Sequence, residues 1–256
     1  LDDAPRELSG KITGSIARRR EGLELSAEMS LDHLTMLQRR LEKIHGKLTK
    51  QAASPLLRVD NLLASAQGGG RMAGFAEVLF VEPMQYGLSL YVEDMPLAQL
   101  FPPPAKEAAK GDPPQGMVSG NLQMTGSANQ PRQALGTLQL SKAKLYKLPV
   151  LLGLLSSVYL SLPGDSAFTD GHVNYRLKDN LLIFDEIYLT GPALSLVGSG
   201  QMDTRTEKIR LTFLTGPPGR IPRLRSLADE LMKLIHKELM EIEVTGKIDR
   251  PITRTV

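Results

Sequence analysis

The side chains most often used in catalysis are few in this chain, and their spacing does not suggest a site. The four histidines are His33, His45, His172 and His236, and none forms the H-x-x-x-H or H-E-x-x-H spacing of a zinc site. Cysteine is absent, which excludes thiolate metal sites and disulfides. We therefore expect no metal and no other cofactor.

Three further stretches could carry chemistry, but each has a simpler interpretation. "GGGRMAG" at 68–74 lacks the G-x-G-x-x-G spacing of a phosphate loop and is followed by a strand pattern, which favours a hairpin turn. Ser199 lies between two glycines but outside the G-x-S-x-G pattern. Asp185 and Glu186 are adjacent, so on a strand they would point to opposite faces and form no carboxylate pair. We predict that the chain is not an enzyme.

The basic run "ARRR" at 17–20 has two readings. It could form the tip of a hairpin between strands at 8–16 and 22–31, or it could contact an anionic membrane surface. The whole chain has 31 basic and 28 acidic residues, which are interspersed and give a net charge of only +3. This balance gives little support for a nucleic-acid partner.

Apolar residues at every second position dominate the chain and predict roughly a dozen strands. Clear examples run from Leu23 to Leu31, from Met72 to Phe80 and from Tyr86 to Val92. Turn signals such as "DN" at 179–180 and "DTRTE" at 203–207 separate the strands. Because these connections are short, we expect a mainly β fold with a long antiparallel sheet.

A short phrase, in which a Gly precedes an apolar residue by two positions, occurs six times. We expect each Gly to lie at a strand entrance, where it relieves a turn or lets crowded backbones approach, so that a long sheet can curl. The intervals are unequal, which excludes a solenoid of constant period. The six residues are Gly10, Gly46, Gly120, Gly136, Gly200 and Gly246.

Two or three short helices interrupt the predicted strands. Residues 148–161 are apolar and 222–241 are amphipathic, whereas 31–44 are equivocal. The helix near 148–161 would span roughly 20 Å, short of the ~30 Å bilayer core, so we expect a core or interfacial helix. A Pro-rich loop at 102–116 separates a β-rich part at 1–101 from a second part at 117–256.

The chain begins at Leu1 rather than Met, and we expect it to be a piece of a longer protein. The absence of cysteine fits an oxidising compartment. A sheet of a dozen strands offers an apolar face of roughly 1,100 Å², and two helices would cover about half of it. The rest must pack on itself in a closed β-sandwich, on a partner, or on an apolar ligand.

The region from 117 to the end resembles the C-terminal region of the AsmA-like family, the superfamily of periplasmic bridge-like proteins that includes AsmA and TamB. The similar stretches are "VSGNLQMTG", "ALGTLQLSKAKLYKLPVLLGLLSSVYLSLP", "FTDGHVNYRLKDNLLIFDEIYLTGPALSLVGSGQMD" and "VTGKIDRP". The chain departs from the family in its Pro-rich insert at 102–114 and in lacking the N-terminal membrane helix.

This resemblance implies an open, curved, taco-like β-groove in the periplasm of a two-membrane bacterium, with the parent protein anchored in the inner membrane. It implies that phospholipid moves between the inner and outer membranes and that the outer membrane is thereby maintained. A hydrophobic groove would hold acyl chains without specific polar contacts, because each buried methylene contributes ~0.8 kcal/mol. The helix at 148–161 would then lie at one end of the groove.

We predict a lipid groove and assign its lining residues from the alternation of apolar residues alone. A shift of one residue in the strand register would therefore place these side chains on the opposite face. The alternative is a non-enzymatic structural or assembly factor for outer-membrane biogenesis, with a closed β-core and a protein partner. The predicted lining residues are Leu122, Met124, Leu138, Leu140, Val173, Tyr175, Leu177, Ile209, Leu211 and Phe213.

Overall fold

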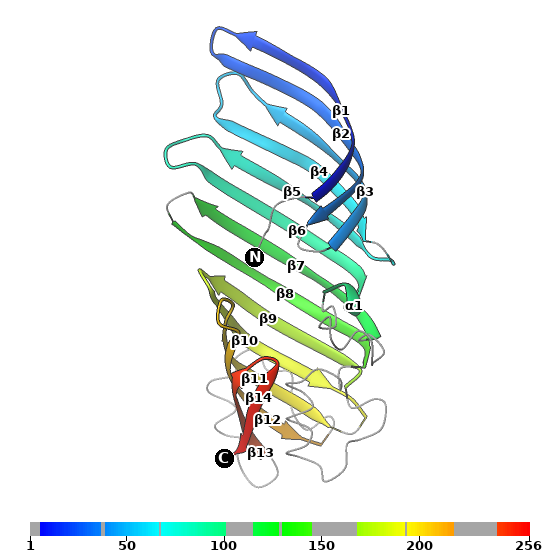
Figure 1. Ribbon diagram of the computed structural model, residues 1–256, viewed down its shortest axis with the longest axis vertical. Coiled ribbons are helices and arrows are strands. Elements are labelled where there is room, and N and C mark those ends of the chain that lie inside the picture. The colour runs from blue at the N-terminus through cyan, green and yellow to red at the C-terminus, as the bar shows by residue number, and fades with distance from the viewer. Residues whose placement is uncertain are drawn as a thin grey trace. The chain divides into compact units, whose positions relative to one another are not determined.

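The computed structural model describes residues 6–36, 39–66, 68–100, 115–127, 130–144, 168–192, 194–217 and 240–256. These residues are almost entirely β-strand, which confirms the mainly β, antiparallel prediction (Figure 1). The elements are β1 (Arg6–Arg19), β2 (Gly22–Met36), β3 (Arg39–Lys50), β4 (Leu56–Ala66), β5 (Arg71–Leu79), β6 (Gln85–Pro96), α1 (Leu97–Leu100), β7 (Gln115–Ser127), β8 (Gln130–Lys144), β9 (Asp170–Lys178), β10 (Leu181–Thr190), β11 (Ser195–Asp203), β12 (Lys208–Gly216), β13 (Met240–Lys247) and β14 (Arg250–Thr255).

The fourteen strands form one sheet in which each strand neighbours the next one along the chain. Strands β1 and β14 stand at the two ends of this order, so the sheet is open. A closed β-sandwich would instead need two sheets packed face to face. Among the described residues, the sandwich alternative is therefore wrong.

The predicted turns are confirmed where the structure describes them. The basic run lies at the β1–β2 hairpin, and Asp179 begins the β9–β10 turn. In the β11–β12 turn, Asp203 Oδ1 accepts hydrogen bonds from the backbone N–H groups of Arg205 and Thr206, at 2.9 and 2.8 Å. The hydrogen bond from Thr206 is the main cause that lowers the pKa of Asp203 below its usual value.

The helix considered at 31–44 is wrong, because the described residues of this stretch, 31–36 and 39–44, belong to β2 and β3. Leu34 pairs with Leu41 across this hairpin, so the apolar residues that suggested a helical stripe meet across two strands instead. Strand neighbours on both sides supply the backbone hydrogen bonds and override local helix propensity. The helices expected at 148–161 and 222–241 lie outside the described residues, while β7 begins inside the predicted loop at 102–116.

The repeated glycines lie within strands, and not at strand entrances as expected. The expected close approach of backbones is present, and Gly200 of β11 shows it. Its φ is +149°, and a Cβ added there would lie 2.2 Å from the Arg210 carbonyl oxygen of β12. A side chain larger than hydrogen would therefore force the two strands apart.

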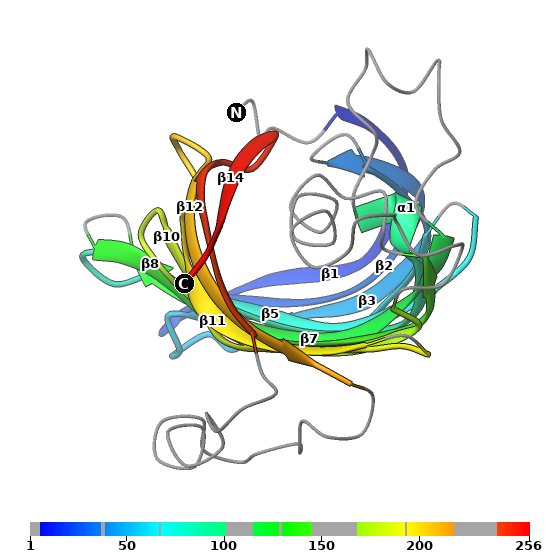
Figure 2. The same ribbon diagram turned by 90° about the horizontal axis from the view of Figure 1, so that it is seen from below.

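The chain divides into two compact units. Unit 1 comprises residues 1–100 and 118–135, and unit 2 comprises 101–117 and 136–256. In unit 1, strands β1 to β6 lie side by side and bend along their length, so that this unit has one concave face (Figure 2).

Candidate functional site

Unit 1 brings apolar side chains into register on one face of its strands. Ala27 pairs with Leu48, and Leu48 pairs with Val59. Val59 pairs in turn with Ala76, and Ala76 pairs with Leu88. Because residues that pair directly across an antiparallel sheet point to the same face, these five side chains form one apolar row across β2–β6.

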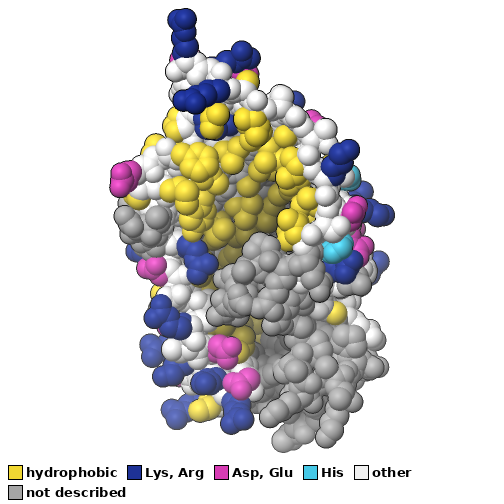
Figure 3. Space-filling model, turned by 45° about the horizontal axis from the view of Figure 1, so that its top comes forward, with side chains coloured by type: hydrophobic (Ala, Val, Ile, Leu, Met, Phe, Trp, Pro, Cys, Tyr) yellow, Lys and Arg dark blue, Asp and Glu magenta, His cyan; other side chains and the backbone are white. Residues whose placement is uncertain are grey.

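Further rows run beside this one, and we call the whole surface the concave face of unit 1. The apolar side chains of this face in β2–β6 are half-buried or buried in the described structure, and Figure 3 shows hydrophobic side chains gathered in a hollow over the upper strands. Apolar surface of this extent on a folded domain usually marks an interaction site. The residues of the face in β2–β6 are Leu25, Ala27, Met29, Leu31, Ile44, Leu48, Leu57, Val59, Leu62, Ala64, Met72, Ala76, Val78, Tyr86, Leu88, Leu90 and Val92.

The opposite, outward face of unit 1 carries charge. Arg58 Nη2 lies 2.9 Å from Asp60 Oδ1, and the Arg58 guanidinium lies 5.6 Å from the centre of the Phe75 ring. Arg71 and Glu93, which pair across β5 and β6, form an ion pair at 3.0 Å. The strands therefore alternate between an apolar and a polar face, as expected for a sheet with water on one side.

Unit 2 continues the same alternation but buries its apolar face more completely. Tyr175 pairs with Phe184, which pairs with Gly200. Gly200 pairs with Leu211, which pairs with Val244. The exposure of side chains in this row falls along it, from half-buried at Tyr175 to 0% at Val244. Burial raises the pKa of the Tyr175 phenol, because the charged form is poorly solvated there.

The predicted lining residues that strand pairing connects to one another share one face of the sheet. In unit 2, Val173, Tyr175 and Leu177 of β9 connect through β10 and β11 to Phe213, Leu211 and Ile209 of β12. The three residues of β9 are half-buried, whereas the three of β12 are buried, with Phe213 only 2% exposed. The β12 residues thus belong to a packed core in the described structure.

The face on which the other four predicted lining residues lie follows from the contacts of nearby glycines. A Cβ added at Gly171 would lie 3.0 Å from Leu140 Cδ1, so Leu140, and by alternation Leu138, face the side of Gly171. A Cβ added at Gly126 would lie 2.4 Å from the Tyr86 hydroxyl oxygen, so Gly126 faces the side of Tyr86. By the same alternation, two further residues of β7 share that face. They are Leu122 and Met124.

The concave residues of β2–β6 were missed as lining, although their alternation is plain in the sequence. The prediction concentrated on 117–256, where the family resemblance lies. In unit 1 the half-buried apolar face nevertheless extends across β2–β6, and it includes residues such as Leu88 and Leu90. Period-two patterning in 72–92 was the signal that could have identified them.

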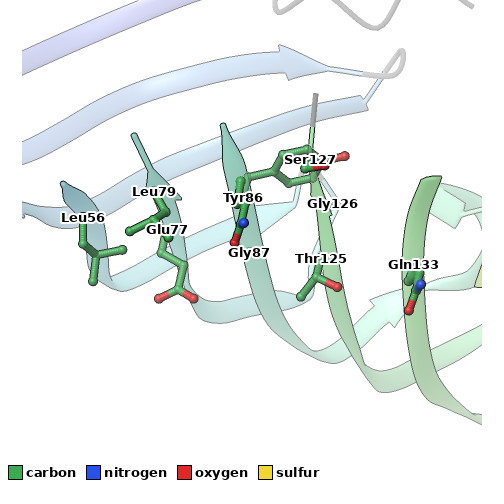
Figure 4. Close-up of a pocket in the computed structure, with 10 residues that line it drawn as sticks. Leu56, Glu77, Leu79, Tyr86, Gly87, Thr125, Gly126, Ser127 and Gln133 are labelled. Carbon is green, nitrogen blue, oxygen red and sulfur yellow. The ribbon is translucent and has the colours of Figure 1, made fainter. Parts of the chain in front are cut away.

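A pocket of about 540 Å³ with a mixed polar and apolar lining lies beside the hairpin ends of unit 1 (Figure 4). Leu56, Glu77, Thr125 and Gln133 extend from one side of their strands into it, and Glu77 belongs to the outward face. The Tyr86 ring points instead toward Gly126. The pocket therefore takes most of its side chains from the outward face, although Tyr86 and Gly126 also belong to its lining.

The expectation that Asp185 and Glu186 point to opposite faces is wrong. A β-bulge in β10 interrupts the alternation at this point. Asp185 Oδ2 accepts a hydrogen bond from Arg176 Nε at 2.7 Å, and Glu186 Oε2 accepts one from Asn174 at 3.0 Å. Arg176 and Asn174 are two residues apart on β9, so both carboxylates lie on the same face.

Both carboxylates accept hydrogen bonds from side chains of β9, so a structural role accounts for them. The hydrogen bond from Arg176 holds the pKa of Asp185 below its usual value. Within the described part of the chain, no three His, Asp or Glu side chains are placed to hold a metal ion. Over the same residues, no helix is long and apolar enough to cross a bilayer.

Comparison with known proteins adds no relative: no family model matches the chain, and neither does any curated protein or solved structure.

Proposed function

We propose that this chain is a periplasmic β-groove module that binds phospholipid acyl chains and conducts them between the inner and outer membranes, in support of outer-membrane maintenance. The observation that carries the proposal is the half-buried apolar concave face of unit 1 in β2–β6, with two ion pairs of charged residues on the opposite face. The resemblance of 117–256 to the AsmA-like family supports the same function, and with it a parent protein anchored in the inner membrane.

The size of the concave face suits an acyl chain. Five spacings of ~4.8 Å separate β1 from β6, so the face extends for roughly 24 Å across the strands. One leaflet of a bilayer has a hydrocarbon depth of roughly 15 Å, half of the ~30 Å core. Since binding would depend on apolar area rather than on directed hydrogen bonds, a chain bound here could slide from row to row.

A structural or assembly factor with a protein partner is the second candidate. The observation that favours it is the buried apolar face of β12 and β13, where Phe213, Ile242 and Val244 are at most 2% exposed. A chain that buried its apolar face this completely along the whole sheet would need no lipid to cover it. The free edge strands of the sheet could then pair with a protein partner.

Photocrosslinking in a two-membrane bacterium tests the proposal. A photoreactive phenylalanine derivative would replace Leu90 on the concave face or Tyr91, its outward neighbour. We expect phospholipid adducts from position 90 and from equivalent concave positions on other strands, and few from position 91. Protein adducts alone from position 90 would favour the second candidate, and equal lipid adducts from both positions would contradict the groove.

A further inference from the structure

Three hairpin tips of unit 1 lie at the same end of its strands. Because the sheet is a meander, the turns that join β1 to β2, β3 to β4 and β5 to β6 must fall on one side, as Figure 1 shows. We call their residues, 17–24, 50–56 and 79–85, the hairpin rim. The rim borders the concave face, since Val78 and Tyr86 of that face pair directly beside it.

Contacts between neighbouring tips make the rim one continuous surface. Lys50 Nζ donates a hydrogen bond to the Leu23 carbonyl oxygen at 3.1 Å, joining the second tip to the first. A Cβ added at Gly22 would lie 2.4 Å from the Ala52 carbonyl oxygen, which shows how closely the same two tips approach. The Phe80 N–H donates to the Pro55 carbonyl oxygen at 2.9 Å and joins the third tip to the second.

The third tip exposes apolar side chains where a hairpin turn usually has small and polar ones. Phe80 is 52% exposed, Val81 is 39% exposed and Met84 is 45% exposed. Leu23 on the first tip is also exposed. Several large apolar side chains on connected, exposed turns are costly in water and favourable at the boundary between lipid head groups and acyl chains.

The first tip adds positive charge to this surface. Arg18, Arg19 and Arg20 are all exposed, and Arg19 forms an ion pair with Glu24 at 2.8 Å. The rim also contains Lys50, together with the acidic residues Glu21 and Glu82. Four basic residues therefore face three acidic ones, so the net charge is +1, with the basic side chains concentrated on one tip.

We infer that the hairpin rim is a membrane-docking surface for a bilayer that contains anionic phospholipid. Phe80, Val81 and Met84 insert at the depth of the head groups, while Arg18 and Arg20 contact lipid phosphates. This inference goes beyond the proposed groove function and does not depend on it, because docking uses side chains of the hairpin turns and strand ends, beyond the apolar rows of the concave face in β2–β6. It does place the apolar rows of that face next to a bilayer.

A fluorescent reporter tests the insertion directly, because the chain contains no Trp. We would place a single Trp by Phe80→Trp in one variant and by Phe75→Trp, on the outward face away from the rim, in another. With vesicles of phosphatidylcholine and phosphatidylglycerol, we expect a blue shift of the emission and quenching by brominated acyl chains only for the Phe80→Trp variant. No change in that variant, or an equal change in both, would overturn the inference.

Vesicle co-sedimentation tests the apolar and the basic side chains of the rim separately. We expect Phe80→Ser with Met84→Ser to weaken binding at least tenfold, and Arg18→Gln with Arg20→Gln to weaken it about tenfold on anionic vesicles only. These side chains are exposed, so circular dichroism should be unchanged. Unchanged binding of the first variant, or equal wild-type binding to anionic and pure phosphatidylcholine vesicles, would contradict the inference.

A groove variant separates this inference from the proposed function. Leu88→Asp changes the concave face and leaves the rim intact, so we expect it to bind vesicles as the unmodified chain does. If Leu88→Asp lost vesicle binding while the rim variants retained it, docking would belong to the concave face and the rim assignment would be wrong.

Discussion

A single carboxylate on the concave face should strongly weaken acyl-chain binding, whereas the same change one residue further along should not. Leu88 and Ser89 are adjacent on β6, and alternation points them to opposite faces. Leu88 pairs with Ala76 in the apolar row, and Ser89 pairs with Phe75 on the outward face. Leu88→Asp and Ser89→Asp therefore add the same charge at nearly the same place, and they differ only in the face that receives it.

The magnitude follows from the lost contact. Covering a Leu side chain with hydrocarbon contributes about 1.5–3 kcal/mol, and a carboxylate left beneath an acyl chain would need to keep its water. A loss of about 2–3 kcal/mol corresponds to a roughly 30- to 150-fold weaker affinity. Because Leu88 is only half-buried without a ligand, the carboxylate of the Leu88→Asp variant can stay hydrated, and the sheet should remain folded.

The assay is titration of each purified variant with a phospholipid that carries a fluorescent acyl chain, accompanied by circular dichroism. We expect Leu88→Asp to lose affinity by the stated factor and Ser89→Asp to change it less than threefold. Equal affinities in the two variants, with strand content intact in both, would refute the assignment of the concave face as the binding surface.

Three further predictions test local parts of the structure. A Cβ added at Gly198 would lie 2.2 Å from Phe213 Cδ1, so Gly198→Ala should cost about 1–3 kcal/mol and Phe213→Ala about 3–5 kcal/mol in urea unfolding. The double variant should lose about 1–2 kcal/mol less than the sum, and strict additivity would argue against that contact. Hydrogen bonding to Arg176 lowers the folded-state pKa of Asp185, so this pair stabilises the fold above the unfolded-state pKa of the carboxyl, and the stabilisation is lost as the pH falls through the folded-state pKa. The Asp185→Asn variant should therefore be slightly less stable than the unmodified chain at neutral pH and equally stable in strong acid. A stability difference that stays constant at every pH would contradict this prediction. Since burial raises the pKa of Tyr175, Tyr175→Phe should remove an ultraviolet titration step above pH ~10, and a step removed at or below that pH would contradict the assigned burial.

The alternation of apolar residues was enough to predict the mainly β class, the antiparallel pairing and most turns. It failed where alternation and helical spacing coincide. Leu31, Leu34 and Leu41 fit a helical stripe, but they also fit two strands joined by a hairpin, and only pairing partners far along the chain decide between the two. It failed again at Asp185, because a bulge moves a residue to the other face without a sequence signal strong enough to reveal it.

Alternation also could not distinguish a half-buried face from a packed one. Leu177 and Leu211 look alike in sequence, yet Leu177 is half-buried while Leu211 is 5% exposed. An Asp at Leu211 would bury a charge and destabilise unit 2, so it would report on folding rather than on lipid. Burial depends on what covers a face, and a periodic pattern does not contain that information.

Lipid analysis of the purified chain tests the central claim most directly. The chain would be expressed in the periplasm of a two-membrane bacterium, purified without detergent and extracted with organic solvent for mass spectrometry. We predict phospholipid in near-stoichiometric amounts, strongly reduced in Leu88→Asp and retained in Ser89→Asp. A folded chain that carries no phospholipid, or the same amount in all three forms, would contradict the account.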